Sequence, residues 1–509
     1  MSQQYFPQSQ TMLLQLSNAT IWQSSNEGFT WKQLYPQQAF LGMTMHSFSP
    51  ERAYLMTNKR KIHYTTDTGR SWNTITPPMD PNNLGIAILD FHPTKADWLI
   101  YTGSADCSST LSSTCRAVSF YSTDHGRNWK KIDEYVRTCA WARDARLKID
   151  EREIICESYK NKQGSQKSGD YNPIELIAGS NYYSKKVKLF ESVVGFASFS
   201  EYLLVAQLNE LAGTLTLQVS LDGYHFSEGQ FPPSMRIENR AYTILESSTD
   251  SVFLHVTMNA ATNREWGSIF KSNSNGTYYG LSIEYVNRNT AGYVDFEKMI
   301  GLDGIAVINI VSNPNDADIS GQKKIQTRIT HNDGGTWKPM NPPARDSLGQ
   351  EYDCRSTACS LQVHGYTERR DPMATYSSPS AVGLMLAVGN VGEELAAYTD
   401  SDIFLTRDGG FTWEEVHKDA HMWEFGDSGS IIVLINDEEP TDHVLYSTDE
   451  GISWSEYAFG QTIRVSSIQT VPMDTSRRFI LLGTRPSEPE KSILVYLDFS
   501  AITQQKCKS

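Results

Sequence analysis

The chain has 509 residues, of which 39% are hydrophobic and 11% aromatic, and it carries a formal net charge of −14. Phosphate binding needs a basic surface, so this charge argues against nucleic acid as a partner. No apolar run approaches the roughly 18 residues of a membrane span, which excludes direct membrane contact by this part of the chain. No helical period of useful length is present.

An eight-residue segment recurs along most of the chain, with Ser or Thr first, Asp or Asn third, Gly fifth and Trp eighth. Its six complete copies begin at Ser24, Thr65, Ser122, Thr330, Thr406 and Ser447. Altered copies begin at Ser220 and Ser272, and a trace near Tyr183–Phe190 is too changed to assert. Most neighbouring copies begin 41 to 58 residues apart. This period is typical of a four-stranded propeller blade.

The residue types in the segment suit a hairpin turn. The Asp or Asn can accept backbone N–H bonds within its own turn, and the Gly tolerates positive φ. The final Trp packs the hairpin onto its sheet; six of the 11 Trp occupy this position, namely Trp31, Trp72, Trp129, Trp337, Trp413 and Trp454. One carboxylate per turn is too few for a calcium site. We therefore interpret the segment as structural and expect no bound metal.

Between these segments the chain contains apolar runs with the length and composition of strands. They are Leu203–Gln207, Thr214–Val219, Val252–Val256, Ile305–Val311 and Ile431–Ile435. Since the repeat extends almost from end to end, we predict one large all-β domain.

The seven cysteines form three short local pairs and leave one over. The pairs are Cys107 with Cys115, Cys139 with Cys156, and Cys354 with Cys359, and the remainder is Cys507. None has the spacing of a zinc site, so the pattern predicts three disulfides in an oxidising compartment. Two glycosylation sequons, at Asn18 and Asn275, agree with entry into the secretory pathway.

Both ends of the chain suggest a fragment of a longer protein. The first ten residues lack the charged start and apolar core of a signal peptide. The unpaired Cys507 lies two residues from the end, where its partner is expected in sequence beyond the chain.

Several motifs resemble those of enzymes, but each lacks residues or spacing that the corresponding chemistry requires. The G-D-S-G at Gly426–Gly429 lacks the next Gly of the serine-protease motif, and it leads into an apolar strand. The G-N-V-G at Gly389–Gly392 is followed by neither G-K-[ST] nor a helix. His364, His417 and His421 show no ligand spacing, and we interpret them as packing or surface residues. Nothing implies a cofactor.

The octapeptide resembles the Asp box of sialidases and of sortilin-type receptors. Gly389–Trp454 adds the order G-N-V-G, Asp box, G-D-S-G strand and second Asp box. This order is similar to the last blades of the sortilin-type vacuolar protein-sorting receptor family, and the likeness continues through Cys354–Tyr366 and Cys139–Cys156. Lys271–Lys298 and His364–Arg370 resemble the second of two tandem domains in fungal members.

The resemblance implies a ten-bladed propeller of four-stranded antiparallel blades over residues 1–505. Residues 506–509 would begin a cysteine-rich module. Such receptors are type I membrane proteins that carry soluble hydrolases, such as carboxypeptidase Y, from the late Golgi to endosomes. The chain would then lie on the lumenal side and bind hydrolases or their peptide segments without catalysis. Its partners in cis would be the cysteine-rich module and the first tandem domain.

Two alternatives remain open. The domain could be a structural or adhesive propeller without cargo of its own. It could also be a sialidase-like glycosidase, although no segment resembles the catalytic strands of that class.

The resemblance also suggests where a ligand would bind. In animal sortilins an Arg of the sixth blade, shortly before an Asp box, binds the ligand's C-terminal carboxylate. Counting back from Ser220 gives Leu215, with Thr216 beside it and Ala206 on the preceding strand. Leu cannot pair with a carboxylate, so we expect an apolar or internal peptide segment along Leu211–Val219.

Overall fold

The structure, a computed structural model, describes residues 2–7, 9–107, 114–144, 146–164, 166, 172–199, 201–233, 242–245, 250–368 and 376–502. The chain divides into two compact units. Unit 1 consists mainly of Met1–Gln230, and unit 2 mainly of Arg240–Ser274 and Tyr278–Ser509.

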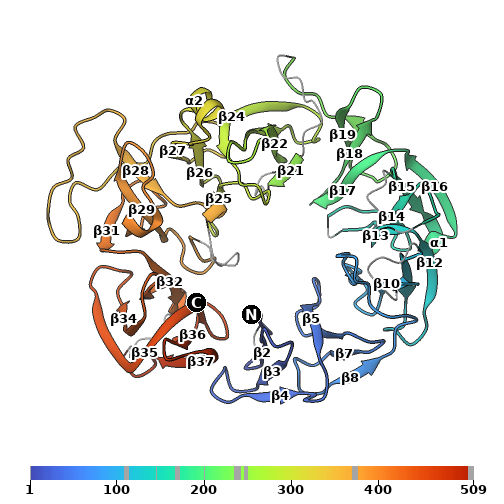
Figure 1. The fold of residues 1–509 in the computed structure, drawn as a ribbon, viewed down its shortest axis with the longest axis horizontal. Coiled ribbons are helices and arrows are strands. Elements are labelled where there is room, and N and C mark those ends of the chain that lie inside the picture. The colour runs from blue at the N-terminus through green and yellow to red at the C-terminus, as the bar shows by residue number, and fades with distance from the viewer. Residues whose placement is uncertain are drawn as a thin grey trace. The chain divides into compact units, whose positions relative to one another are not determined.

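Unit 1 contains five antiparallel sheets of four strands, in which strands adjacent in the chain are also adjacent in the sheet (Figure 1). The first two sheets are β1 (Ser2–Tyr5), β2 (Met12–Gln15), β3 (Ile21–Ser24) and β4 (Lys32–Leu34), then β5 (Phe40–Met45), β6 (Ala53–Thr57), β7 (Ile62–Thr65) and β8 (Asn73–Ile75). The third is β9 (Leu89–Phe91), β10 (Leu99–Ala105), β11 (Arg116–Ser122) and β12 (Lys130–Glu134). The fourth is β13 (Val136–Trp141), β14 (Ile154–Tyr159), β15 (Ile174–Gly179) and β16 (Lys185–Phe190), with α1 (Ser180–Tyr183) before its last strand. The fifth is β17 (Val193–Phe199), β18 (Tyr202–Asn209), β19 (Thr214–Ser220) and β20 (Ser227–Glu228).

Unit 2 contains three antiparallel sheets, of which the first and the third are larger than four strands. The first contains β21 (Tyr242–Leu245), β22 (Phe253–Asn259), β23 (Trp266–Ser272), β24 (Tyr279–Asn287), β25 (Phe296–Lys298), β26 (Ala306–Val311) and β27 (Ile325–Thr330). The second is four-stranded: β28 (Ser360–Val363), β29 (Met385–Gly392), β30 (Asp402–Thr406) and β31 (Glu414–His417). The third contains β32 (His421–Gly426), β33 (Ile431–Asn436), β34 (Thr441–Ser447), β35 (Ser455–Thr470), β36 (Arg478–Arg485) and β37 (Glu488–Asp498). The helices are α2 (Pro314–Ser320), η1 (Tyr366–Glu368), η2 (Tyr398–Asp400) and η3 (Asp427–Gly429).

Each of the two larger sheets consists of two parts, which are connected through one residue pair in the first case and through one long strand in the second. β24 pairs with β26 only through Val286 and Ile310. The 16-residue β35 pairs with β34 through its first part and with β36 through its second. The predicted all-β, four-stranded antiparallel plan is confirmed, whereas strand pairing alone does not divide the chain into ten blades.

The predicted strands are present. Leu203–Gln207 lies within β18 and Ile431–Ile435 within β33. Val252 and Ile305, the first residues of two predicted runs, lie just before β22 and β26. The trace near Tyr183–Phe190 is not an octapeptide turn, because Asn181, Tyr182 and Tyr183 all have positive φ and lead directly into β16.

In five of its six complete copies the octapeptide forms the turn between the third and fourth strands of a sheet, and its polar groups bond one another. The copy at Thr330 follows β27 and leads to the single bridge between Ile329 and Lys338. In the copy at Ser447, the serine Oγ accepts the N–H groups of Asp449 and Gly451 at 3.2 and 2.8 Å. That hydroxyl donates to Asp449 Oδ1 at 2.8 Å. Asp449 in turn accepts the N–H and the hydroxyl of Ser453 at 2.9 and 2.6 Å.

This bonding changes the electrostatics of the turn. Burial acts to raise the pKa of Asp449, but the hydrogen bonds from Ser453 and Ser447 outweigh it and lower that pKa. The backbone also needs the glycine, since Glu450 and Gly451 have φ of 63° and 82°. The carboxylate is therefore committed to its own turn, as the structural interpretation requires.

The turns at Thr65 and Ser447 also contact the sheet before them. Gln23 of β3 donates from Nε2 to Gly69 O at 2.8 Å and accepts from Trp72 Nε1 at 2.8 Å. Arg407, just after β30, donates to Gly451 O at 2.6 Å. These two turns thus join consecutive sheets within each unit.

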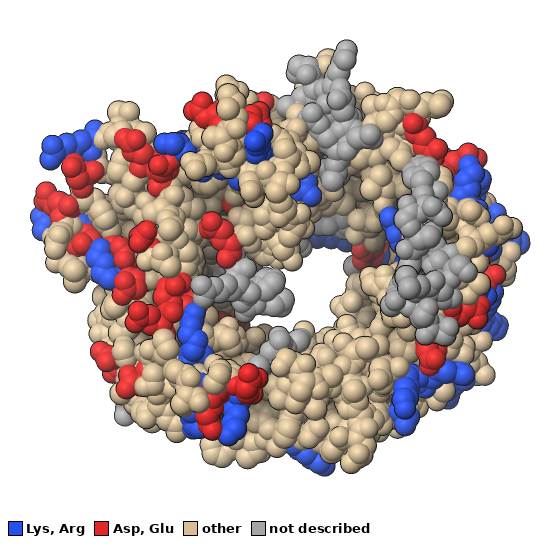
Figure 2. All heavy atoms as spheres, viewed as in Figure 1, with Lys and Arg blue, Asp and Glu red and all other residues tan. Residues whose placement is uncertain are grey.

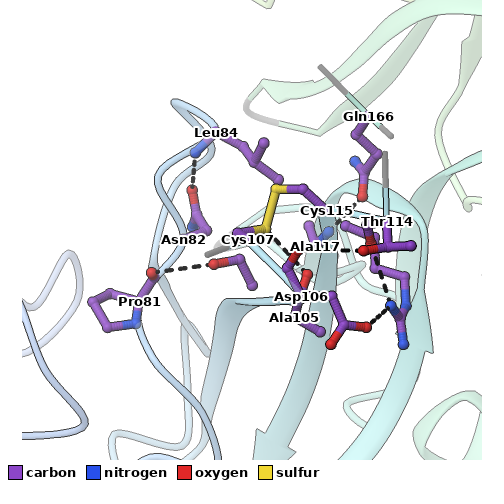
Figure 3. The surroundings of a disulfide bond; sticks show 12 residues. Pro81, Asn82, Leu84, Ala105, Asp106, Cys107, Thr114, Cys115, Ala117 and Gln166 are labelled. Carbon is purple, nitrogen blue, oxygen red and sulfur yellow. Dashed lines mark hydrogen bonds and ion pairs between the residues drawn. A yellow bond between two sulfur atoms is a disulfide. The ribbon is translucent and has the colours of Figure 1, made fainter. Parts of the chain in front are cut away.

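The three cysteine pairs are those expected from the sequence. Cys139 and Cys156 lie directly opposite each other on β13 and β14. Cys107 and Cys115 close the loop between β10 and β11, as Figure 3 shows. Beside them Gln166 accepts the N–H of Ala117 and holds the loop base. Cys507 and residues 506–509 lie outside the described residues.

Two surface properties bear on function. On the face shown in Figure 2, Lys and Arg side chains lie interspersed with Asp and Glu. In the part of the chain that the structure describes, none of the helices has the length and apolar character needed to cross a membrane.

Candidate ligand-binding site

The three residues proposed from the sequence lie on the fifth sheet of unit 1, but they do not all lie on the same face of it. Leu215 and Thr216 are on β19, opposite Leu208 and Gln207 of β18, and Ala206 is opposite Leu217. Side chains alternate between the two faces of a strand, so Leu215 and Ala206 share a face and Thr216 lies on the other.

Leu215 is also a poor contact residue because its exposed fraction is only 8%. It belongs to a buried series with Leu217 and Val219. The predicted strand Leu211–Val219 begins later than expected, at Thr214, after a turn in which Leu211 is fully exposed. All of its residues pair with β18, whereas only Gln218 and Val219 pair with β20. The first part of the strand therefore has a paired strand on one side only, and peptide pairing along this segment stays a prediction.

Arg288, which sequence reasoning missed, supplies a guanidinium in the next sheet along the chain. It follows β24, and its Nη1 donates to Thr257 Oγ1 of β22. Burial lowers its pKa, and nearby Glu265 acts in the opposite direction. In the described part of the chain, no carboxylate lies within ion-pair distance of its guanidinium. Arg288 is therefore a cation that an anionic ligand group could pair with.

His364 is part of a Ser–His–Glu arrangement in which the Ser and the His are buried and Glu368 is exposed. Its Nε2 lies 3.0 Å from Ser401 Oγ, and its Nδ1 contacts Glu368 Oε2. The Ser401 hydroxyl also donates to Ala397 O at 3.0 Å, and Ser401 is only 1% exposed. A nucleophile must reach its substrate, so this arrangement acts as packing, as the sequence predicts for His364.

The other singled-out motifs are structural as well. Gly426–Gly429 spans the end of β32 and η3, and it leads into β33, the second strand of its sheet. Gly389–Gly392 is the end of β29 rather than a phosphate-binding loop. Among the described residues, no group of three or more His, Cys, Asp or Glu is arranged to hold a metal ion.

His417 is exposed and His421 is buried, which agrees with the predicted surface and packing roles, and both also line a cavity in unit 2. The cavity has a volume of about 220 Å³ and lies between the end of β31, the start of β32 and the β33–β34 loop. His443 of β34 completes a group of three imidazoles. The histidines are 4 and 22 residues apart in sequence, so no local pattern indicates them.

Comparison with known proteins decides the family. A family model described as Sortilin-Vps10 (sortilin, neurotensin receptor 3) matches residues 19–468. The chain belongs to the Sortilin-Vps10 family.

Individual relatives agree over almost the whole chain. The Vacuolar protein sorting/targeting protein 10 of Laccaria bicolor is 58% identical over 503 residues, covering 98% of this chain and 34% of that protein. Proteins of the same name from Mycosarcoma maydis and Paracoccidioides brasiliensis are 55% and 40% identical, covering 99% and 97% of this chain and 34% of each relative. The chain thus spans about a third of the length of these relatives. A solved β-propeller domain of a Pyrococcus furiosus protease covers 82% of this chain and 95% of its own, at 8% identity and a TM-score of 0.29, too low to support an argument.

Counting the sheets in chain order gives a second position to set beside Leu215, which stays a prediction. The turn at Ser220 belongs to the fifth sheet, whereas the sixth in chain order contains β21–β24 and ends its third strand at Ser272. Five residues before Ser272 lies Gly267, where an added Cβ would lie 2.3 Å from Val256 O. No arginine fits there, so the sixth sheet, like the fifth, lacks this cation at the counted position.

Proposed function

We propose that this Sortilin-Vps10 chain is a lumenal ligand-binding domain of a receptor that carries soluble hydrolases from the late Golgi to endosomes and the vacuole. The observation that supports this most strongly is the 58% identity to a vacuolar sorting protein along 98% of the chain. An identity this high, along a segment that makes up one third of a longer protein, is typical of a domain that has kept its role.

The proposal includes the architecture. Residues 1–505 form a ten-bladed propeller, in which the seven-stranded and six-stranded sheets each supply two blades, and residues 506–509 begin a cysteine-rich module. The single Val286–Ile310 pairing and the length of β35 support dividing those sheets at these places.

The cellular setting follows from the cysteines and sequons. Three disulfides suit a lumenal location in a type I membrane protein of Golgi and endosome. Asn18 and Asn275, the proposed glycan acceptors, are both exposed. The Thr20 hydroxyl donates to Asn18 Oδ1 at 2.6 Å in a surface turn.

Binding without catalysis is the favoured activity. Ser401 is buried, and the octapeptide carboxylates are bonded within their turns. These observations favour a receptor over a sialidase-like enzyme. A structural propeller without cargo is the second candidate, supported by the lack of an arginine at Gly267.

Capture of soluble hydrolases tests the proposal. The purified chain, immobilised through its C-terminus, is exposed to fungal vacuolar hydrolases, and bound protein is identified by mass spectrometry. We expect saturable hydrolase binding and no turnover of a fluorogenic sialoside. Absence of capture, with the chain shown folded by its thermal transition, would favour the structural propeller.

Matched peptides locate the contact. We expect C-terminal acid and amide forms of a captured hydrolase segment to bind equally, since neither Leu215 nor Gly267 offers a cation. A strict requirement for the free acid that disappears in Arg288→Gln would instead assign carboxylate recognition to Arg288.

A further inference from the structure

Three imidazoles line this cavity in unit 2, and neighbouring atoms determine which nitrogen of each ring carries the hydrogen. His417 Nδ1 lies 2.7 Å from Lys418 O, and His421 Nδ1 lies 2.9 Å from Asp419 O. A carbonyl oxygen can only accept, so each Nδ1 carries the hydrogen and each Nε2 keeps a lone pair.

His443 has the same tautomer. Its Nδ1 lies 3.1 Å from Asp442 Oδ1 and 3.3 Å from Thr441 Oγ1. The threonine hydroxyl donates to His443 O at 3.2 Å, which leaves its oxygen to accept. All three rings therefore offer acceptor nitrogens when neutral.

One of these rings is largely buried, yet its Nε2 makes no hydrogen bond within the described part of the chain. His421 is only 5% exposed, and its ring centroid lies 5.0 Å from that of His417. Within the described residues, no donor reaches the Nε2 atom. The Nε2 atom is open to solvent in the cavity, so a bound N–H group can donate a hydrogen bond to it.

The other residues that line the cavity supply negative charge and apolar surface. Asp419 and Glu439 line the cavity, as do Leu434, Leu445 and Pro440. Neither Lys nor Arg is among the lining residues. Lys418, the nearest cation in sequence, is held by Asp346, Asp402 and Glu415 at 2.7 to 3.2 Å.

We propose that this cavity binds the basic side chain of a cargo peptide, with arginine preferred. A guanidinium brings five N–H donors to a site that contains acceptors and carboxylates, and its methylene stem suits the apolar floor. The volume is that of one side chain rather than of a drug-sized ligand. This inference rests on the proposed cargo-binding function.

Two short probes test the chemistry directly. Acetyl-Gly-Gly-Arg-Gly-amide and its citrulline analogue have the same shape, but only the first is charged. We expect saturation-transfer NMR on the whole chain to show at least about fivefold tighter binding of the arginine probe, the order of a rim ion pair. Equal binding of the two probes would overturn the proposal.

Variants place the binding in the cavity. Glu439→Gln and His417→Gln change exposed residues and are expected to weaken arginine binding about threefold or more. Glu490→Gln, an exposed glutamate of β37, is the control and should have no effect. Buried His421→Phe is expected to abolish binding, and the two exposed variants decide the matter if it does not fold. Unchanged binding in both exposed variants would reject the site.

The result of the arginine-binding test can be distinguished from the result of the hydrolase-capture test. Hydrolase capture that is unaffected by Glu439→Gln and His417→Gln would keep the receptor and reject this cavity as its contact. Selective arginine binding without hydrolase capture would keep the basic-group site and reject the receptor.

Discussion

The octapeptide turns and the imidazole cavity are both polar clusters in this protein, but they differ in how their hydrogen bonds are completed. In the turn at Ser447 both oxygens of Asp449 accept bonds from within eight residues. In the cavity, the Nε2 of His421 is left without a donor. A cluster that satisfies itself stabilises the fold, whereas one that leaves acceptors open can take up a ligand.

The altered turns show which parts of the self-satisfied cluster matter. At Ser220, one residue is missing and Phe226 replaces the Trp, yet Asp222 still accepts the N–H groups of Tyr224 and His225 at 2.9 and 2.8 Å. At Ser272 the Asp is absent, and the hydroxyl accepts the N–H of Val252 instead. The hydroxyl is thus the part that every copy keeps, whereas the carboxylate and the Trp are replaceable.

The largest effect is expected from removing this hydroxyl. Ser447→Ala leaves the N–H groups of Asp449 and Gly451 without their acceptor in a site where Ser447 is only 1% exposed. We expect a loss of about 2 kcal/mol in the free energy of unfolding, measured by urea titration. Ser455→Ala, an exposed serine of β35, is the control. A loss no greater than that of the control would contradict the turn's structural role.

Removing the carboxylate should cost less because Asp449 is partly exposed, whereas Ser447 is buried. Asp449→Ala is expected to lower the free energy of unfolding by about 1 kcal/mol, like the loss of a helix N-cap. Calcium and EDTA should leave the melting temperature of wild type and variant unchanged. A calcium-dependent rise that disappears in the variant would identify a metal site.

The pH dependence of that cost is a sharper test. The folded pKa of Asp449 is lowered, so its contribution is present above the unfolded pKa of about 3.9 and is lost as pH falls through the folded value. The stability difference between wild type and Asp449→Ala should be constant from pH 7 to 5 and shrink below pH 4. Urea titrations at pH 7, 5 and 3.5 measure it, and a difference that grew in acid would refute the assignment.

The smallest stability effect is expected in the cavity. His443→Gln changes a partly exposed residue whose Nε2 has no partner in the described chain, so the free energy of unfolding should change by less than about 0.5 kcal/mol. Binding of the arginine probe should nevertheless weaken. A large loss of stability with unchanged binding would show that the cavity residues stabilise the fold, as the octapeptide turns do, and do not bind the probe.

The sequence indicated the turns well because their chemistry is local. A hydroxyl, a carboxylate and a glycine within eight residues satisfy one another whatever the rest of the chain does, and the same locality applies to the paired Cys354 and Cys359. The all-β plan and the family resemblance followed from these repeated segments. Strand runs such as Ile431–Ile435 needed only their own apolar residues.

The binding residues depended on relations between distant segments. Counting from Ser220 selected Leu215, but only the sheet order places that turn in the fifth sheet, and only the strand pairing puts Thr216 on the opposite face. The acceptor character of His417 and His421 depends on which backbone oxygens their Nδ1 atoms meet. Tertiary structure decided these points because strand pairing with distant segments sets the face on which a side chain lies. It also sets the backbone geometry that brings each histidine Nδ1 onto a carbonyl one or two residues away.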